Sequence, residues 1–187
     1  METAERHATQ NELEAATDYV LASPKQQSTL QVIVVRPKAN ERVTLEQAEL
    51  SPEGGIAGDR WSVDPWERLP DGSPHPHSQV SLMNSRVLEL IAGEAAAMPL
   101  AGDNLILDLD LSEENLPAGT RLQIGSEVLL EMTAAPHTGC GKFQKRYGKA
   151  AREFVNGEIG SKHNLRGRMA KVVQPGTIRV GDEVQKL

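Results

Sequence analysis

Apolar residues near the N-terminus follow a helical repeat. Between Glu12 and Val20 they recur at a loose 3.6-residue spacing, and Ser23-Pro24 ends the pattern. The apolar stripe is thin, so we expect this segment to pack poorly or to fray. From Leu30 the pattern changes to a β-branched run that Pro37 stops, which is typical of a buried strand. We therefore predict an N-terminal helical extension over residues 1–27 and one β-rich domain over residues 28–187.

The stretch from residue 51 to residue 78 has no regular period. It is rich in glycine and proline and contains both tryptophans, Trp61 and Trp66. A loop of this length in a compact domain is usually functional or disordered. The tryptophans and the run Gly54–Arg60 favour a functional loop, and we expect the two indole rings to cover the mouth of the domain.

The rest of the chain reads mostly as short strands with glycine-containing turns. A helix is expected over residues 85–92, capped by Asn84 and closed by Gly93, and a second over residues 142–155. Strands are expected at residues 43–50, 79–83, 104–111, 122–124, 128–132, 169–173 and 177–185. This pattern predicts a mainly β fold, a barrel decorated by two or three helices.

Composition narrows the class of protein. The chain has 187 residues, 39% of them hydrophobic, which suits one domain with a real core. No apolar run approaches the roughly 20 residues of a membrane helix, and the polar N-terminus does not look like a signal peptide. One cysteine cannot form an internal disulfide, so we expect a cytoplasmic protein.

Charge is distributed unevenly. The net charge of -6 argues against nucleic acid as a partner, yet residues 142–171 hold nine Lys and Arg against two Glu. A basic segment directly after the only cysteine suggests a small anionic ligand. The alternative, that these charges form a solvated helix face, stays open.

The sequence points to Cys140 as the chemical centre. It lies between an expected strand and an expected helix, where backbone N–H groups and the helix dipole favour a thiolate. Gly139 and Gly141 would let a bulky ligand approach the sulfur. The positive side chains nearby are those of His137, Lys142, Lys145 and Arg146. A lone cysteine can equally be an inert buried residue.

Three kinds of chemistry can use such a thiol. Zinc is improbable, because His137 and Cys140 supply two ligands where three or four are needed, and His75 and His77 in a proline-rich loop are more simply read as exposed. A Cys–His hydrolase, with His137, His163 or a loop histidine as the base, has no oxyanion or orienting motif to support it. A soft metal held by its own cofactor needs only one protein sulfur and fits best.

An ordered series of motifs resembles the MOSC domain, the module named for the C-terminal part of molybdenum-cofactor sulfurase. The series covers about residues 30–187 and comprises Gly54–Arg60, Gln79–Asn84, Gly102–Leu105, Leu116–Gly125, the strand before Cys140, and Gly176–Asp182. Three positions depart from the family. Trp61 stands where a histidine is common, Asp103 replaces a glutamate, and residues 134–139 contain no arginine and no proline directly before the cysteine. Arg60, Lys142, Arg146, Arg166 and Arg168 are the candidates to replace that arginine.

The resemblance implies a barrel similar to the small β-barrel domain of pyruvate kinase. It also implies a molybdenum cofactor (molybdopterin) with Cys140 as the metal ligand and the reduction of N-hydroxylated compounds, with electrons from a separate flavin or iron–sulfur partner. Other members are proposed sulfur carriers that hold a persulfide on this cysteine, and the family has an association with pyridoxal phosphate. A non-catalytic binding barrel is the third alternative. The positions carried over as cofactor-binding are Gly58, Asp59, Arg60, Asp103, Asn104, His137, Lys142 and Arg146.

The expected partners follow from these alternatives. They are a small-molecule substrate or a protein that donates or accepts sulfur, with no nucleic acid and no membrane.

Overall fold

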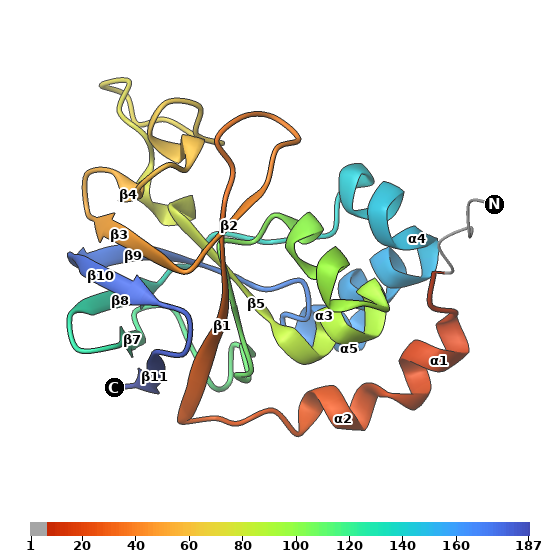
Figure 1. Cartoon of the computed structure of the whole chain (residues 1–187). Coiled ribbons are helices and arrows are strands. Elements are labelled where there is room, and N and C mark those ends of the chain that lie inside the picture. The colour runs from red at the N-terminus through yellow and green to blue at the C-terminus, as the bar shows by residue number, and fades with distance from the viewer. Residues whose placement is uncertain (1–6) are drawn as a thin grey trace.

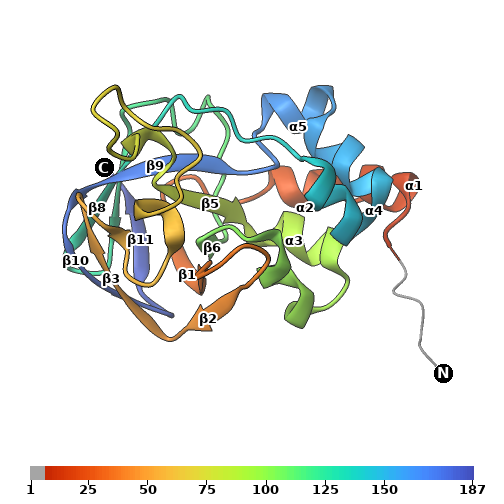
Figure 2. The same cartoon turned by 90° about the horizontal axis from the view of Figure 1, so that it is seen from above.

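The computed structural model describes residues 7–187 and consists of a β-barrel with helices gathered at one side (Figure 1). The first six residues of the predicted N-terminal extension lie outside the described residues. Helices α1, α3, α4 and α5 stand together beside the strands in both views (Figures 1 and 2).

Seven of the strands within residues 7–187 close into a barrel. They are β1 (Gln27–Val35), β5 (Val80–Asn84), β6 (Leu105–Leu107), β7 (Arg121–Ile124), β8 (Val128–Met132), β9 (Arg168–Gln174) and β11 (Glu183–Lys186). The pairing order is β11-β7-β8-β9-β5-β6-β1, and β1 then pairs with β11. Every pair is antiparallel except β5–β6, whose crossover contains helix α3 (Ser85–Ala92). The predicted mainly β barrel is confirmed.

Alternate residues of the strands next to the helices face two different cores. On β1, Ile33 packs inside the barrel, whereas Val34 packs into the helical core. Leu82 and Met83 on β5 divide in the same way. Because successive strand residues point to opposite faces, these strands are buried on both sides and read as continuous apolar runs.

The strand predicted over residues 43–50 is two strands. β2 (Val43–Leu45) pairs with β1, and β3 (Gln47–Ser51) pairs with β10 (Gly176–Arg179) in a second sheet that also holds β4 (Gly55–Ile56). Glu46 separates them, and its carbonyl oxygen accepts a hydrogen bond from the Val180 N–H. The break at Glu46 lets the two halves pair in different sheets.

The strand predicted over residues 104–111 is also shorter than expected. The ladder ends at Leu107, although Leu109 and Leu111 remain buried. Beyond it the chain bonds to other partners, since the Leu109 carbonyl accepts from the Asn84 side chain and the Asp110 N–H donates to the Pro24 carbonyl. The alternation of leucines therefore indicates which residues are buried, but not how far the strand extends.

Local signals predicted two helices well. α3 has Asn84 as its N-cap and a left-handed Gly93 at its C-cap, as expected. α4 (Gly141–Asn156) matches the second prediction but is kinked at Gly148, whose φ of 88° favours glycine. Helix α5 (Glu158–Lys162) and 3-10 helices at Arg60–Ser62, Pro76–Ser78 and Ala95–Ala101 were not predicted. No helix within residues 7–187 combines the length and apolarity that crossing a membrane requires.

The N-terminal segment packs better than its sequence indicates. It forms α1 (Gln10–Ala15) and α2 (Thr17–Leu21), which bury Leu13 and Val20 in the helical core beside Phe143 and Tyr147. The expectation of poor packing is wrong, because two well-placed side chains are enough to anchor a short helix pair. The domain boundary at residue 27 stays a prediction.

Shortening Leu13 tests this anchoring. Leu13 is 1% exposed, and Leu13→Ala should lower the free energy of unfolding by about 2–3 kcal/mol, because it leaves a cavity between α1 and α4. Chemical denaturation measures the loss. The neighbouring exposed Glu14→Ala should change stability by less than about 0.5 kcal/mol, and an equal, small effect of both variants would show that the segment does not contribute to the fold.

Candidate functional site

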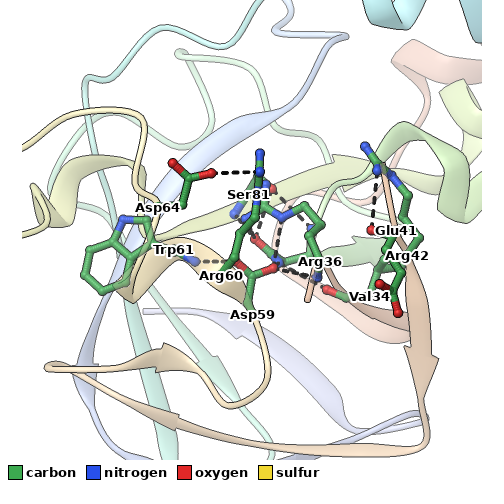
Figure 3. Close-up of polar contacts among 10 residues, drawn as sticks. Val34, Arg36, Glu41, Arg42, Asp59, Arg60, Trp61, Asp64 and Ser81 are labelled. Carbon is green, nitrogen blue, oxygen red and sulfur yellow. Dashed lines mark hydrogen bonds and ion pairs between the residues drawn. The ribbon is translucent and has the colours of Figure 1, made fainter. Parts of the chain in front are cut away.

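A buried carboxylate holds one arginine at the end of strand β1. Asp59 Oδ2 accepts hydrogen bonds from the backbone N–H and from Nε of Arg36, both at 2.9 Å, and Oδ1 accepts from Arg36 Nη2 at 3.0 Å (Figure 3). Asp59 Oδ1 also accepts from the Trp61 N–H at 3.0 Å, which caps the 3-10 helix Arg60–Ser62. One carboxylate thus ties the loop after β4 to β1 and fixes the Arg36 side chain.

Asn104 completes this arrangement. Its Nδ2 donates to Asp59 Oδ2 at 3.0 Å and to the Val34 carbonyl at 3.1 Å. Its Oδ1 accepts from Arg36 Nη2 at 3.2 Å and from the N–H and the hydroxyl of Ser81 at 3.1 Å. The residue is fully buried and joins β1, β5 and the start of β6. The hydrogen-bonding groups of Asp59 and Asn104 are already engaged within the protein, and both side chains hold Arg36 in position.

Burial on its own raises the pKa of Asp59. The hydrogen bonds and the positive charge of Arg36 outweigh it, helped by the backbone N–H groups of Arg36 and Trp61, so the pKa lies below its ordinary value. The carboxylate is therefore ionised at neutral pH and balances Arg36.

A second buried carboxylate, that of Asp103, holds an arginine on the other side of the site. Asp103 Oδ2 accepts from Arg166 Nη1 at 2.7 Å, and its Oδ1 lies 3.5 Å from His137 Nε2, which is long for a hydrogen bond. The Arg166 guanidinium lies over the Phe143 ring, 4.8 Å from its centre. Burial lowers the pKa of His137 to about 3, with a further contribution from the charge of Arg166, so this histidine is neutral at physiological pH.

Arg36, Arg166 and His137 border a cavity of about 480 Å³, a size typical of small-molecule sites. Three arginines line it, together with both tryptophans, His137 and Cys140; these arginines are Arg36, Arg60 and Arg166. Trp61 is buried, whereas Trp66 is 63% exposed; that the two rings cover the mouth stays a prediction.

Several buried polar atoms of the lining residues have no hydrogen-bond partner. They are Trp61 Nε1, Ser78 Oγ, His137 Nδ1 and Arg166 Nε. Buried polar atoms are normally paired, so this group indicates that a ligand or ordered water satisfies them. Donors predominate in the cavity, which favours a ligand rich in acceptors and negative charge.

Cys140 lies at the rim of this cavity, exposed, as the N-cap residue of α4. Partial burial raises the pKa of its thiol. The backbone N–H groups of Phe143 and Lys142 and the charge of Arg166 lower the pKa by more, so it falls below its ordinary value. No capping hydrogen bond joins the side chain to these amides, so they act through their dipoles. The pKa shift has the direction expected for a thiol at the start of a helix.

Of the site residues predicted from the sequence, some line the cavity and others do not. Cys140, Arg60 and His137 line the cavity, while Asp59, Asp103 and Asn104 stand behind it and position Arg36 and Arg166. Gly58 supplies a left-handed turn, with φ of 86°. Lys142 and Arg146 lie on α4 and do not line the cavity.

Four residues of the basic segment were considered as replacements for an arginine before Cys140. Arg166 lines the cavity, whereas Arg168 is buried against Glu113 and the Thr133 carbonyl. Lys142 is exposed on α4, as a solvated helix face requires, and Arg146 is half-buried on the same helix. The segment thus serves two purposes, and Arg166 is its contribution to the cavity.

Arg36 and Ser78 line the cavity and were not recognised from the sequence. The only local signal for Arg36 is its position directly after a buried strand and before Pro37. His75 and His77 do not line the cavity. Their ring centres lie 3.8 Å apart with the ring planes tilted by 35°, and His77 Nε2 contacts Glu67 Oε2 at 3.0 Å.

A protein-family model described as the MOSC domain matches residues 70–185, well over half of the chain. The chain belongs to the MOSC domain family. Solved structures of similar fold include the YuaD protein from Bacillus subtilis, at 18% identity and a TM-score of 0.62 over 86% of this chain and 95% of that one. YiiM from Geobacillus stearothermophilus is also 18% identical, with a TM-score of 0.55 over 86% of this chain and 75% of the other. No curated protein matches the sequence.

YiiM from Escherichia coli has the same identity of 18% and a TM-score of 0.51, over 85% of this chain and 69% of that one. At these identities the solved structures establish the shared fold of this MOSC protein and nothing finer.

The acidity of Cys140 can be measured directly, because it is the only cysteine. We expect the thiolate absorbance near 240 nm to appear with a midpoint below the ordinary thiol pKa of about 8.5 in the folded protein, and at the ordinary value in urea. Arg166→Met should raise the folded midpoint, whereas Lys149→Met, on an exposed turn of α4, should leave it unchanged. Equal midpoints in folded and unfolded protein would contradict the assignment.

Removing the charge of Asp59 should destabilise the fold. Asp59→Asn should cost about 2 kcal/mol at pH 7, because Arg36 loses its buried partner. The pKa of Asp59 is lowered by folding, so its contribution is complete above about pH 4 and is lost as the pH falls through the folded-state value. The gap between wild type and variant, measured by denaturation, should therefore close in acid. Asp64→Asn removes an exposed partner of Arg60 and serves as the control with little effect.

Proposed function

We propose that this MOSC protein binds a molybdenum cofactor in the cavity, with the Cys140 thiolate as a metal ligand, and reduces N-hydroxylated compounds. The observation that carries the proposal is the position of Cys140, a thiol of lowered pKa at the rim of a cavity lined by three arginines. Membership of the MOSC family supports it.

The residues present fit such a cofactor. A thiolate is a suitable ligand for a soft metal, and one protein sulfur suffices when the cofactor supplies the others. The unpaired Trp61 Nε1 and Arg166 Nε are donors for the oxygen and nitrogen acceptors of a pterin. Arg36, Arg60 and Arg166 offer guanidinium groups to its phosphate. These arginines come from other elements, which removes the need for one just before Cys140.

The cofactor, when bound, would supply the two-electron chemistry that breaks an N–O bond. The protein residues would orient and shield the substrate. Neutral His137 presents an unpaired Nδ1 and can exchange a hydrogen bond with a polar substrate, while Asp103 limits the movement of its ring. Trp66 at the mouth offers an apolar surface that restricts water. We expect the electrons to come from a separate flavin or iron–sulfur protein.

Metal and pterin analysis tests the proposal. Protein from a cofactor-competent host should contain molybdenum and the fluorescent oxidised pterin, and should reduce an N-hydroxylated amidine with reduced viologen as the electron donor. Cys140→Ser should lose at least about 100-fold of this activity, because the metal loses its thiolate ligand. Ser62→Ala, an exposed site outside the cavity lining, should retain both cofactor and activity. Wild-type protein without molybdenum and without pterin would contradict the proposal.

The exposure of Cys140 favours one second function. An accessible thiolate can accept a sulfur atom from the persulfide of a cysteine desulfurase and pass it to metal–sulfur cluster assembly. Cyanide-releasable sulfur on the wild type, absent in Cys140→Ser, together with no molybdenum, would favour this carrier role.

A further inference from the structure

Asn156, the last residue of α4, binds the backbone of Gly139, the residue directly before Cys140. Its Oδ1 accepts a hydrogen bond from the Gly139 N–H at 2.7 Å, and its Nδ2 donates to the Gly139 carbonyl at 2.9 Å. Arg152 Nε donates to the same carbonyl at 3.1 Å. Side chains from the second half of α4 therefore hold both backbone hydrogen-bonding groups of Gly139.

A bend in α4 makes this contact possible. An α-helix rises about 1.5 Å per residue, so the ends of a straight helix over Gly141–Asn156 would lie roughly 22 Å apart. Gly148 has φ of 88° and ψ of 170°, which are not helical, and the chain turns there. The second half of α4 thus returns to the segment that leads into the first half. Arg152 Nη1 also donates to Gln144 Oε1 at 2.9 Å across the bend.

The two glycines that flank Cys140 have different surroundings. A Cβ atom added to Gly139 would come within 3.1 Å of Val155 Cγ2 and 3.2 Å of Asn156 Nδ2. A Cβ atom added to Gly141 would meet no atom of residues 7–187 within 4 Å beyond its immediate neighbours. Gly139 is therefore in tight contact with the end of α4, whereas the space beside Gly141 is open.

The contact anchors a segment that has few other attachments. Residues 136–138 line the cavity, and among residues 7–187 their backbone groups make no hydrogen bond. The start of the segment is held by Thr133, whose N–H and hydroxyl both donate to backbone carbonyls. Its end is held at Gly139, and Cys140 follows as the N-cap residue of α4. Losing the Gly139 contact would free the thiol together with the cavity wall beside it.

We propose that Asn156, supported by Arg152, is a positioning residue for Cys140, whose place at the rim of the cavity it fixes through Gly139. A site keeps its geometry when neighbouring groups lock the residues that carry it, and two hydrogen bonds to one residue restrict both its position and its orientation. The inference rests on the proposed function for the role of the thiol, but the contact itself can be tested without any cofactor.

Alkylation of the only cysteine tests the proposal on the full chain without cofactor. At pH 7 we expect iodoacetamide to modify Cys140 about threefold more slowly in Asn156→Ala than in the wild type, because a displaced thiol loses the backbone N–H groups that favour the thiolate. The thiol is already exposed, so a looser segment does not speed the reaction by improving access. Gly139→Ala should have the same effect. Gly141→Ala is the matched control and should react at the wild-type rate.

Combining two changes separates one shared contact from two independent defects. Asn156→Ala and Gly139→Ala break the same contact, so the double variant should react at most about 1.5-fold more slowly than the slower single variant. Multiplied effects in the double variant would overturn the proposal. A wild-type rate in an Asn156→Ala protein that thermal melting shows to be folded would also overturn it, as would equal losses in Gly139→Ala and Gly141→Ala.

Metal retention connects the contact with the proposed function. In protein from a cofactor-competent host, Asn156→Ala should hold molybdenum about tenfold less tightly than the wild type during dialysis, because the group that positions the ligand residue is lost. Equal retention in both proteins would overturn the positioning role. Wild-type protein without molybdenum would contradict the proposed function, while slower alkylation of the variants would still support the positioning of Cys140 by Asn156.

Discussion

The contact between Asp59 and Arg36 is the constraint on which the site depends. Asp59 is a carboxylate buried between the end of β1 and the loop after β4, and it is tolerable there because Arg36, two backbone amides and Asn104 all donate to it. The same hydrogen bonds fix the path of the long irregular loop. They also hold Arg36 at the cavity, so one ion pair ties the loop after β4 to the barrel and positions an arginine that lines the cavity.

Asp103 and Arg166 repeat this arrangement on the side of the cavity next to α4. In both pairs the acidic residue is nearly inaccessible to solvent and its arginine lines the cavity. The acidic residues therefore hold the arginines in position, and the arginines are the groups that face a ligand. Cys140 differs from both, because its thiol is set by the start of a helix and not by a side-chain partner. The site therefore combines fixed positive groups with one exposed, acidic thiol. That combination suits an anionic cofactor with a soft metal better than it suits a hydrolase, for which His137 is buried, neutral and held next to Asp103.

The elements whose ends are set by local signals could be predicted from the sequence. Helix α3 is bounded by Asn84 and Gly93, each recognisable from its neighbours, and the start of α4 after Cys140 follows from the glycines and the helical spacing. The role of Arg36 could not be predicted, because its partners lie 23 and 68 residues away and meet it only when the barrel closes. For the same reason Asp59 and Asn104 were expected to contact a ligand, although the fold uses up their hydrogen-bonding capacity. The end of β6 at Leu107 depends on the neighbours of Asp110 and Leu109, which the alternation of leucines does not reveal.

The central claim is that Cys140 supplies the protein sulfur to a molybdenum centre in this cavity. X-ray absorption at the molybdenum edge tests it most directly, on wild-type protein and Cys140→Ser prepared from the same cofactor-competent host. The account predicts that the wild-type metal has one more sulfur neighbour than the metal in the variant. The same sulfur count in both proteins would contradict it, as would a wild-type protein in which no molybdenum can be detected.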